Sequence, residues 1–424
     1  MKFVLIANGL TNHGEHSYRL VHEVLGALNR RGIEGRAYAA MSLDPAIVGE
    51  GIAIPHFKHS LYDHIGTPPL TGFSAQIEQW RNGGSILSRP DEYLTWRFLN
   101  RSFCRDLNTL PADDTSSNRL LVITAICQNQ ISGLADFMRS RPRGSLPNVV
   151  CQLMFPPHWT PWETPAKYAD RYYREALQKA APLIGDKLFF TTENEPIAQI
   201  YLERYGIETK ILPVPFARTR PPRLSQKTVR LGFFGYSKSE KGFHLLPDVA
   251  DLCRSAGLDV EFDIQIQHSR WEPVTIAAEE KLRGMPNVRL IEGALNSDDY
   301  TAATDRADVI LLPYDPVLFG MRGSGLFTES VAAGRPIIAS SGTFAGESIL
   351  RGEAQGETFR PHDAQQLFAA IERILPRLPE IVARAQAQAE SFARRHDGDA
   401  YVDALLGLFN GAYGHPQEME NERR

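Results

Sequence analysis

Apolar positions along the chain alternate between short continuous runs and runs with helical spacing. The first such run, KFVLIA, is typical of a buried strand. Between Ser17 and about Arg31, apolar side chains recur every three or four positions, which predicts an amphipathic helix capped by Ser17. Gly32 ends this helix, and GRAYAA resumes as a strand. A strand, a helix and a strand in this order predict a βαβ unit and therefore a parallel sheet.

The same alternation continues through the rest of the first half. Predicted strands are RLLVITAI, NVVCQLMF, KLFFTTE and the closing ETKILPVPF, and predicted helices are residues 132–139 and PIAQIYLERYG. Between residues 43 and 115 the pattern is weaker, and it predicts a helix near residues 92–107 among loops rich in Gly and Pro.

A stretch rich in Pro and Arg, FARTRPPRLSQKT, has no periodicity and is interpreted as a linker, with a boundary near residue 220. After it the pattern restarts. Predicted strands are VRLGFFG, VEFDIQI, NVRLIEG and DVILLPY, and predicted helices are residues 242–256, 297–307, 363–374 and one or two long helices over 380–408. A helix and strand also lie within MRGSGLFTESVAAGRPIIAS, residues 321–340.

These patterns predict two Rossmann-like doubly wound α/β domains that face a central cleft at the carboxyl ends of their strands. The expected divisions are an acceptor-binding domain over 1–219, a donor-binding domain over 220–385, C-terminal helices over 386–414 that cross back to the first domain, and a disordered tail over 415–424. A chain of 424 residues is also long enough for two or three domains of about 150 residues each.

Composition narrows the class of protein. With 43% hydrophobic and 23% charged residues the chain is typical of a globular protein, and a net charge of -4 gives nothing global to attract nucleic acid. The four cysteines are scattered, which argues against a disulfide framework or a zinc site and fits a reducing cytoplasm. The apolar start is too short for a signal peptide, and no run approaches the roughly 18 residues that span a bilayer.

Two loops carry the chemistry that binds a phosphate. In VRLGFFGYSKSEKGF a strand is followed by a loop with Lys238 and Lys241, placed where a helix start presents free N–H groups. The alternative is an ordinary solvated helix start. The second loop is Gly323-Ser324-Gly325, whose amides and the preceding Arg322 suit a diphosphate.

Glu329 is the single carboxylate in the helix predicted after this second loop. About one turn from the helix start, it is placed to accept hydrogen bonds from a ribose diol. A favourable charge near a helix N-terminus is the alternative, but it explains less well why Glu329 lies among Ala, Val, Leu and Phe.

Over most of residues 228–375 the sequence resembles the donor domain of GT-B glycosyltransferases, specifically the family 4 type. GYSKSEKG is similar to the family's glycine- and lysine-containing phosphate loop. ADVILLPY is similar to the strand that follows a helix later in the family's donor domain. ESVAAGRPII is similar to the second half of its Glu-x7-Glu motif, which makes Glu329 the second glutamate. The resemblance implies a retaining, metal-independent hexosyltransferase that uses a nucleotide-diphosphate sugar as co-substrate and needs no cofactor.

Two positions depart from the family pattern. Tyr236 stands where the family has a phosphate-binding arginine, and Met321 stands where it has the first motif glutamate. We expect Arg322 to replace the lost arginine. Carried over to this chain, the resemblance and the loops assign catalytic roles to Lys241, Arg322 and His158, and donor-binding roles to Gly235, Tyr236, Lys238, Ser324, Gly325 and Glu329. No Asp-x-Asp motif stands at a strand end, and no metal ligand is assigned.

The first half is expected to bind the acceptor, an unidentified glycan, lipid-linked glycan or other precursor in cell-envelope polysaccharide biosynthesis. Its candidate residues are Gly9, His13 and Gly14 in the first loop, His158 beside Trp159 and Trp162, and Gln128, Asn129 and Gln130 after a strand. A surface position for His13, and packing of the loop by the two tryptophans, are the alternatives.

The expected localisation is cytoplasmic, with possible peripheral contact at the inner face of a membrane through two arginine groups. These groups are Arg139, Arg141 and Arg143, and Arg218, Arg220 and Arg223. Solvated loops are the alternative. Two other functions stay open at this level: a nucleotide-sugar epimerase of the same architecture and a non-enzymatic two-lobed ligand-binding protein.

Overall fold

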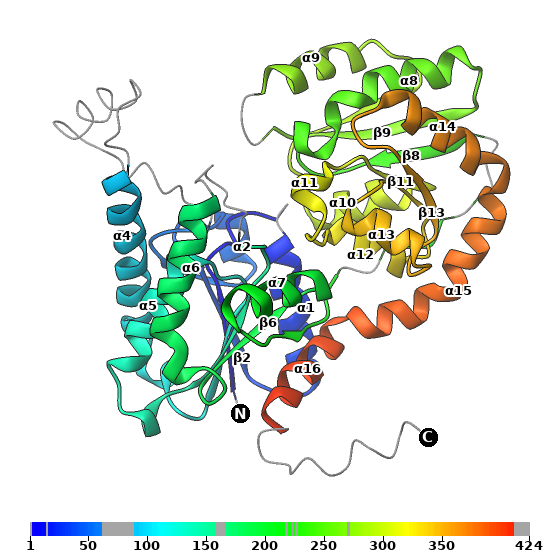
Figure 1. The fold of residues 1–424 in the computed structure, drawn as a ribbon. Helices are drawn as coiled ribbons and strands as arrows, with labels where there is room; N and C mark the ends of the chain where they lie inside the picture. The colour runs from blue at the N-terminus through cyan, green and yellow to red at the C-terminus, as the bar shows by residue number, and fades with distance from the viewer. Residues whose placement is uncertain are drawn as a thin grey trace.

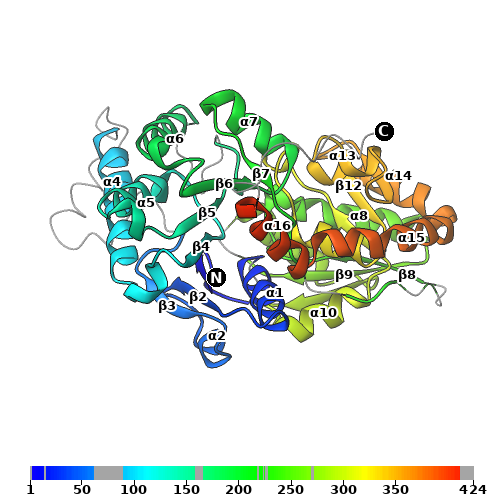
Figure 2. The ribbon, with the colours of Figure 1, turned by 90° about the horizontal axis from the view of Figure 1, so that it is seen from below.

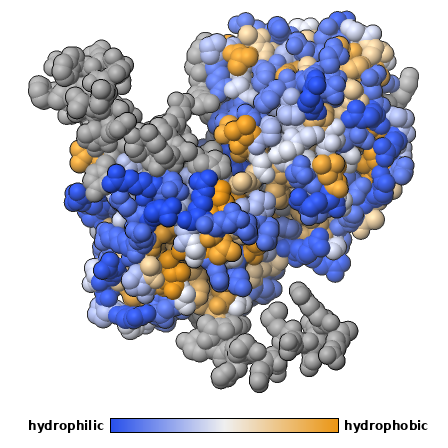
Figure 3. Space-filling model, viewed as in Figure 1, coloured by the Kyte–Doolittle hydropathy of each residue, from blue (hydrophilic) through white to orange (hydrophobic). Residues whose placement is uncertain are grey.

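The computed structural model describes residues 2–13, 16–61, 89–157, 166–216, 219–222, 224, 228–268 and 272–410, without the side chains of 16, 89–93, 166–169 and 410. Two α/β domains lie side by side as two lobes (Figures 1 and 3), and two C-terminal helices lead from the second domain to the first. Every strand pairing in the described sheets is parallel, as the βαβ pattern predicts.

The first domain is built on a sheet with strand order β3-β2-β1-β4-β5-β6-β7. Its strands are β1 (Lys2–Ala7), β2 (Gly35–Ala40), β3 (Ile54–Phe57), β4 (Arg119–Ile123), β5 (Asn148–Gln152), β6 (Leu188–Thr192) and β7 (Lys210–Ile211). The helices are α1 (His16–Arg30), α2 (Pro45–Gly49), α4 (Arg89–Asn108), α5 (Gln128–Arg139), α6 (Ala166–Ala180) and α7 (Glu195–Tyr205). Because helices cover both faces, the central strands are continuous apolar runs rather than alternating ones.

The second domain repeats this plan with strand order β10-β9-β8-β11-β12-β13. Its strands are β8 (Val229–Phe233), β9 (Val260–Ile266), β10 (Val288–Glu292), β11 (Val309–Leu312), β12 (Ile337–Ser340) and β13 (Gly356–Phe359). The helices are α8 (Leu246–Ser255), α9 (Pro273–Leu282), α10 (Ser297–Asp305), α11 (Pro316–Phe319), α12 (Gly325–Ala332), α13 (Phe344–Leu350) and α14 (Ala364–Ile374). The strand order places the loops after β8 and β11 next to each other.

The C-terminal helices join the two domains. Helix α15 (Leu378–His396) packs against α12 of the second domain, and α16 (Gly398–Asn410) lies along α1 of the first (Figures 1 and 2). Arg31 anchors α16 through Asp399 at 2.9 Å and Asp403 at 2.5 Å. Buried Tyr401 donates to Gln152 Oε1 in β5 at 3.1 Å. The chain therefore passes from the second domain to the first between α15 and α16, near residue 397.

Two predicted helix starts are wrong. Helix α5 begins at Gln128 rather than at 132, because the Gln130 side chain accepts a hydrogen bond from the Cys127 N–H and so stabilises an earlier first turn. In the second domain the regular helix begins at Leu246 rather than at 242. Gly242 has a φ of +73°, and a Cβ there would lie 2.1 Å from the carbonyl oxygen of Pro313, so this position suits glycine and interrupts the helix.

Candidate active site

The two domains meet at the loop that precedes α12. The Asn194 side chain, just after β6, donates to the carbonyl oxygen of Met321 at 2.8 Å. The Met321 side chain packs against the apolar core of the first domain. A carboxylate oxygen of Glu193 lies 3.2 Å from the position that a Cβ on Gly323 would take. Met321 therefore serves as an apolar contact between the domains.

The structure places one of the predicted phosphate-binding cations, Lys241, directly beside Gly235. This glycine follows β8 with a φ of +99°, and its N–H donates to Gln265 Oε1 at 2.8 Å. A Cβ on Gly235 would lie 3.0 Å from the Lys241 ammonium nitrogen, so the lysine rests directly on the glycine backbone. Burial, followed by the charges of Lys238 and Arg322, lowers the pKa of Lys241 to about 8.

The other two cations lie close enough to Lys241 to repel its charge. The Lys238 ammonium is 5.5 Å from the centre of the Tyr236 ring and 3.6 Å from a carboxylate oxygen of Glu240. Arg322 stacks with its guanidinium 4.6 Å from the centre of the Phe319 ring. The three cations thus lie in one cluster, with the carboxylates of Glu240 and Glu272 beside the loop, and such a concentration of cations favours an anionic ligand.

The N-terminus of α12 adds its dipole to this cation cluster. Ser324 is the N-cap, and its hydroxyl accepts a hydrogen bond from the Phe327 N–H at 3.4 Å. Gly325 is the first helical residue. The ring of buried Tyr314 connects the two parts, because Lys241 Nζ lies 5.6 Å from its centre and Ser324 partly offsets the rise that burial causes in the pKa of its hydroxyl. The structure therefore brings the predicted residues Lys241, Arg322, Ser324 and Gly325 together, next to the positive end of the α12 dipole.

Glu329 lies one turn further along α12 and is only 2% exposed. Arg19, from α1 of the first domain, forms an ion pair with one carboxylate oxygen of Glu329, and Tyr300 donates to the other at 2.9 Å. The Arg19 guanidinium also lies 3.8 Å from the centre of the Tyr300 ring. Burial and the neighbouring carboxylate raise the pKa of Tyr300, so its hydroxyl remains a donor. Both oxygens of Glu329 thus have protein partners.

The candidate acceptor-binding residues of the first domain have no described contact with the cation cluster. Gly9 lies in the turn after β1, and His13 pairs with Glu50 at 2.8 Å while its ring packs on Tyr18 at 4.7 Å. Gly14 and His158, together with Trp159 and Trp162, lie outside the described residues. His13 is therefore held within its own domain by an acidic partner.

Buried amides stand at the carboxyl ends of two adjacent strands of the first domain, β1 and β4. Asn8 and Asn129 are at most 1% exposed, and none of their side-chain polar atoms has a hydrogen-bond partner in the described part of the chain. Gln128 Nε2 is likewise buried without a hydrogen-bond partner among the described residues. Unsatisfied buried amides are costly, so this edge of the sheet favours a polar ligand or ordered water.

Sequence reasoning missed several residues of the site. Gln265 carries a signal that was available, since it is a polar residue near the end of the apolar strand VEFDIQI. The sequence gives no such signal for the other residues, because their partners are distant in the sequence and mostly in the other domain. These residues are Arg19, Tyr300, Glu193 and Asn194. No group of three metal-ligating side chains occurs among the described residues.

The fold and the interdomain cleft define the class of structure: a GT-B fold, with two parallel α/β domains. A glycosyltransferase from Rickettsia africae superposes with a TM-score of 0.61 at 12% identity over 98% of this chain and 99% of its own. HepE from Anabaena in complex with UDP-glucose superposes with a TM-score of 0.60 at 12% identity, over 97% of this chain and 100% of its own. TarM superposes with a TM-score of 0.54 at 15% identity. The superposition covers 73% of this chain and only 58% of TarM. No protein-family model matches the sequence, and no curated protein does at significant similarity.

Proposed function

We propose that this protein is a glycosyltransferase that moves a sugar from a nucleotide-diphosphate donor to an acceptor bound by the first domain, with retention. The observation that carries the proposal is the cation cluster of Lys238, Lys241 and Arg322 at the N-terminus of α12. Structural neighbours that include a complex with UDP-glucose support it at the level of fold.

In the proposed reaction the bond between the sugar's anomeric carbon and the diphosphate oxygen breaks, and the electron pair leaves with the diphosphate. The anomeric carbon then bonds to an acceptor hydroxyl oxygen, and the proton of that hydroxyl passes to the departing diphosphate. Negative charge grows on the departing diphosphate, and Lys241, Arg322 and the positive end of the α12 dipole are placed to stabilise it. A partly enclosed cleft strengthens each of these interactions relative to water.

Release of nucleoside diphosphate from a panel of nucleotide sugars tests this proposal. A glycosyltransferase is expected to release nucleoside diphosphate slowly without acceptor and faster once a suitable acceptor is present. Interconversion of two nucleotide sugars would instead identify an epimerase. Binding without turnover of any donor, in the presence of a broad acceptor panel, would favour the ligand-binding alternative.

In the ribose role that we propose for Glu329, the donor and Arg19 compete for the same carboxylate. We predict that Glu329→Gln weakens nucleoside-diphosphate binding by about 1.5–3 kcal/mol, the scale of hydrogen bonds to a charged group. Arg19→Met is expected to tighten binding by at least about threefold, because it frees an oxygen of Glu329.

Calorimetry on both variants measures these effects, with Arg31→Met as a control that removes ion pairs outside the cleft. Unchanged affinity in Glu329→Gln would rule out the ribose role. Weaker binding in Arg19→Met would mean that Arg19 contacts the donor itself.

We also propose that the reaction needs no metal, since the three cations offer the charge that a metal would otherwise provide. Turnover is therefore expected to persist within about twofold in excess EDTA. Initial rates with and without chelator check this. A loss of turnover that manganese or magnesium restores would show that the diphosphate needs a bound cation.

Contact with a membrane surface is proposed for the outer face of α4, at the edge of the first domain (Figure 1). The inner face of this helix packs into the core through Trp96, Leu99, Phe103 and Leu107. Its outer face exposes Leu94 by 59% and Phe98 by 43%, one turn apart. Arg97, Arg101 and Arg105 are exposed on the same face. Apolar and cationic side chains together suit an anionic lipid surface.

This face differs from the surface expected from the sequence. Arg143 pairs with Asp186 at 2.7 Å, and Arg141 stacks on Phe137 at 4.1 Å. The backbone N–H of Arg220 donates to Asp305 at 2.6 Å, and its exposed guanidinium lies 3.7 Å from the same carboxylate. Arg218 and Arg223 lie outside the described residues. In the described part of the chain, no helix has the length and apolar character needed to cross a bilayer.

The double variant Leu94→Ser with Phe98→Ser is expected to reduce co-sedimentation with phosphatidylglycerol vesicles by about fivefold or more, because both side chains lose their apolar contact with lipid. Val317→Ser is the matched control, since Val317 is 79% exposed on α11 of the other domain. Equal vesicle binding by the double variant, the control and the parent protein would exclude this face.

A further inference from the structure

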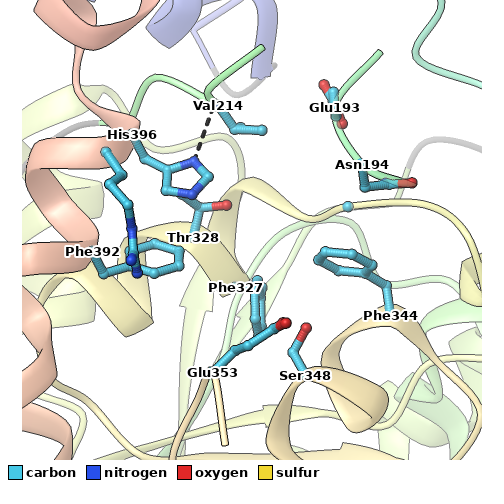
Figure 4. A pocket seen from close by; sticks show the side chains of 12 residues that line it. Glu193, Asn194, Val214, Phe327, Thr328, Phe344, Ser348, Glu353, Phe392 and His396 are labelled. Atoms are coloured by element: carbon cyan, nitrogen blue, oxygen red, sulfur yellow. Dashed lines mark hydrogen bonds between the residues drawn. The ribbon is translucent and has the colours of Figure 1, made fainter. Parts of the chain in front are cut away.

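A cavity of about 350 Å³ lies at the junction of the two domains and α15, on a different side of α12 from Glu329. Glu193 and Asn194 of the first domain border one side, and Phe392 and His396 of α15 border the opposite side (Figure 4). Residues of α12 and α13, with Val214, Gly323 and Glu353 from nearby loops, form the remaining wall. This volume lies in the range of pockets that hold small molecules.

The cavity is distinct from the cation cluster. None of Lys238, Lys241 and Arg322 lines it. Phe327 and Thr328 of α12 face the cavity, whereas the next residue, Glu329, is held by Arg19 and Tyr300. Gly323 is the point that the two regions share, because it lines the cavity and lies next to Arg322.

Aromatic rings give the cavity flat apolar walls. The rings of Phe327 and Phe344 meet edge to face with centres 5.6 Å apart. The Phe392 ring stacks on His396 with centres 4.4 Å apart. Such surfaces bind a planar apolar body through face and edge contacts.

His396 offers a hydrogen-bond donor to this space. Its Nδ1 accepts a hydrogen bond from the Val214 N–H at 3.2 Å (Figure 4). Burial, followed by the charge of Arg395, lowers the pKa of His396 to about 4, so the ring is neutral at physiological pH. A neutral ring whose Nδ1 accepts must carry its proton on Nε2, and this N–H is the remaining donor.

The two ends of the cavity carry different charges. Arg395 contributes to lowering the pKa values of both His396 and Glu353, so its positive charge acts across the cavity. Glu353 is itself bound by Arg351, with both contacts at 2.9 Å, which balances its charge. The end near Arg395 and His396 therefore favours an anionic group, while the end near Glu193 favours a hydrogen-bond donor.

We propose that this cavity is a second ligand site, for a small aromatic organic anion whose planar body lies against the phenylalanine rings that line it and whose carboxylate, sulfonate or phosphate meets Arg395 and His396. Both domains and α15 contribute walls, so a bound molecule stabilises the arrangement in which they meet. Because Gly323 belongs to the loop that carries Arg322, the ligand biases the position of that loop. The site is thus placed to modulate the cleft without occupying it.

Fluorescence titration with anilinonaphthalenesulfonate tests the site, since this probe is itself an aromatic anion of suitable size. Arg395→Ala and Arg394→Ala form a matched pair: both arginines lie in the last turn of α15, but only Arg395 lines the cavity, and Arg394 pairs with Glu390 at 3.3 Å. Lys241→Met serves as a third variant that reports binding in the nucleotide site instead.

The expected result is saturable binding at one site that weakens about fivefold or more in Arg395→Ala and stays within about twofold of the parent in Arg394→Ala and Lys241→Met. Absence of saturable binding, or equal affinities in Arg395→Ala and Arg394→Ala, would overturn the proposal. Loss of the probe in Lys241→Met would assign it to the cation cluster. These outcomes do not depend on whether a nucleotide sugar is the substrate.

Discussion

Replacing Lys241 by Met is expected to weaken nucleoside-diphosphate binding by about 100-fold or more while making the protein more stable. The loss of affinity follows from removing the cation that lies on Gly235, directly below the proposed diphosphate. The gain in stability follows from removing a buried charge that two neighbouring cations repel. At pH 7 we expect the free energy of unfolding to rise by about 1–3 kcal/mol.

Lys241 is also expected to make the stability and the diphosphate affinity of the parent protein depend on pH. Its pKa falls from 10.5 to about 8 on folding, so the penalty for the charged form is fully present below pH 8 and fades towards pH 10.5. A bound diphosphate stabilises the protonated form. Affinity is therefore expected to be flat below pH 8 and to fall above it, by at most about tenfold per pH unit.

Calorimetry between pH 6.5 and pH 9.5 and denaturant unfolding measure both effects, around a pKa of about 8. Lys281→Met is the control, because Lys281 lies on α9 and pairs with Asp248 at 3.9 Å on the surface. If Lys241→Met retains parental affinity, or if the parent protein binds equally well at pH 7 and pH 9, the lysine does not hold the diphosphate.

Arg322→Ala is expected to lower kcat by about 100-fold or more, the scale for loss of one group that stabilises transition-state charge. Arg322 stands beside the proposed phosphate loop, in which the sequence resemblance leads us to expect an arginine at the position of Tyr236. Its charge reaches Lys241, as the lowered pKa of that lysine shows, and its guanidinium is oriented by the Phe319 ring at 4.6 Å. A planar group held in this way can present two N–H donors to one phosphate.

Arg322→Lys is expected to recover only part of the lost activity, because an ammonium keeps the charge but neither stacks as a plane nor donates as a fork. Steady-state kinetics of both variants decide the matter, with Arg254→Ala as a control that removes an exposed arginine of α8. A kcat for Arg322→Ala within about threefold of the parent would assign the phosphate contact to other groups, such as Lys238.

The predicted association of Lys241 with Arg322 could be reached from sequence because both follow strands of one parallel sheet. Gly235 follows β8 and Arg322 lies in the segment after β11, and these strands are neighbours. Loops at the carboxyl ends of neighbouring strands lie close together, whatever their distance along the chain. Continuous apolar runs likewise predicted the strands, because burial on both faces leaves no polar alternation to obscure them.

The surroundings of Glu329 could not be reached in this way. Its partner Arg19 is 310 residues away in the other domain, and the pairing depends on how the two domains are set against each other. The cavity beside α15 has the same origin, since three separate segments form its walls. The early start of α5 is a local effect, in which one side chain, Gln130, outweighs the weak helical propensity of the residues around it.

The central claim is that the cluster of Lys238, Lys241 and Arg322 holds the diphosphate of a nucleotide donor. Isothermal titration of UDP, GDP and ADP into the parent protein and Lys241→Met, at pH 7 and in the presence of EDTA, tests it most directly. The account predicts that at least one nucleotide binds the parent protein at a single site with a Kd below about 1 mM, and that Lys241→Met binds it about 100-fold more weakly or not at all. Failure of all three to bind the parent protein, or equal affinity for the two proteins, would contradict it.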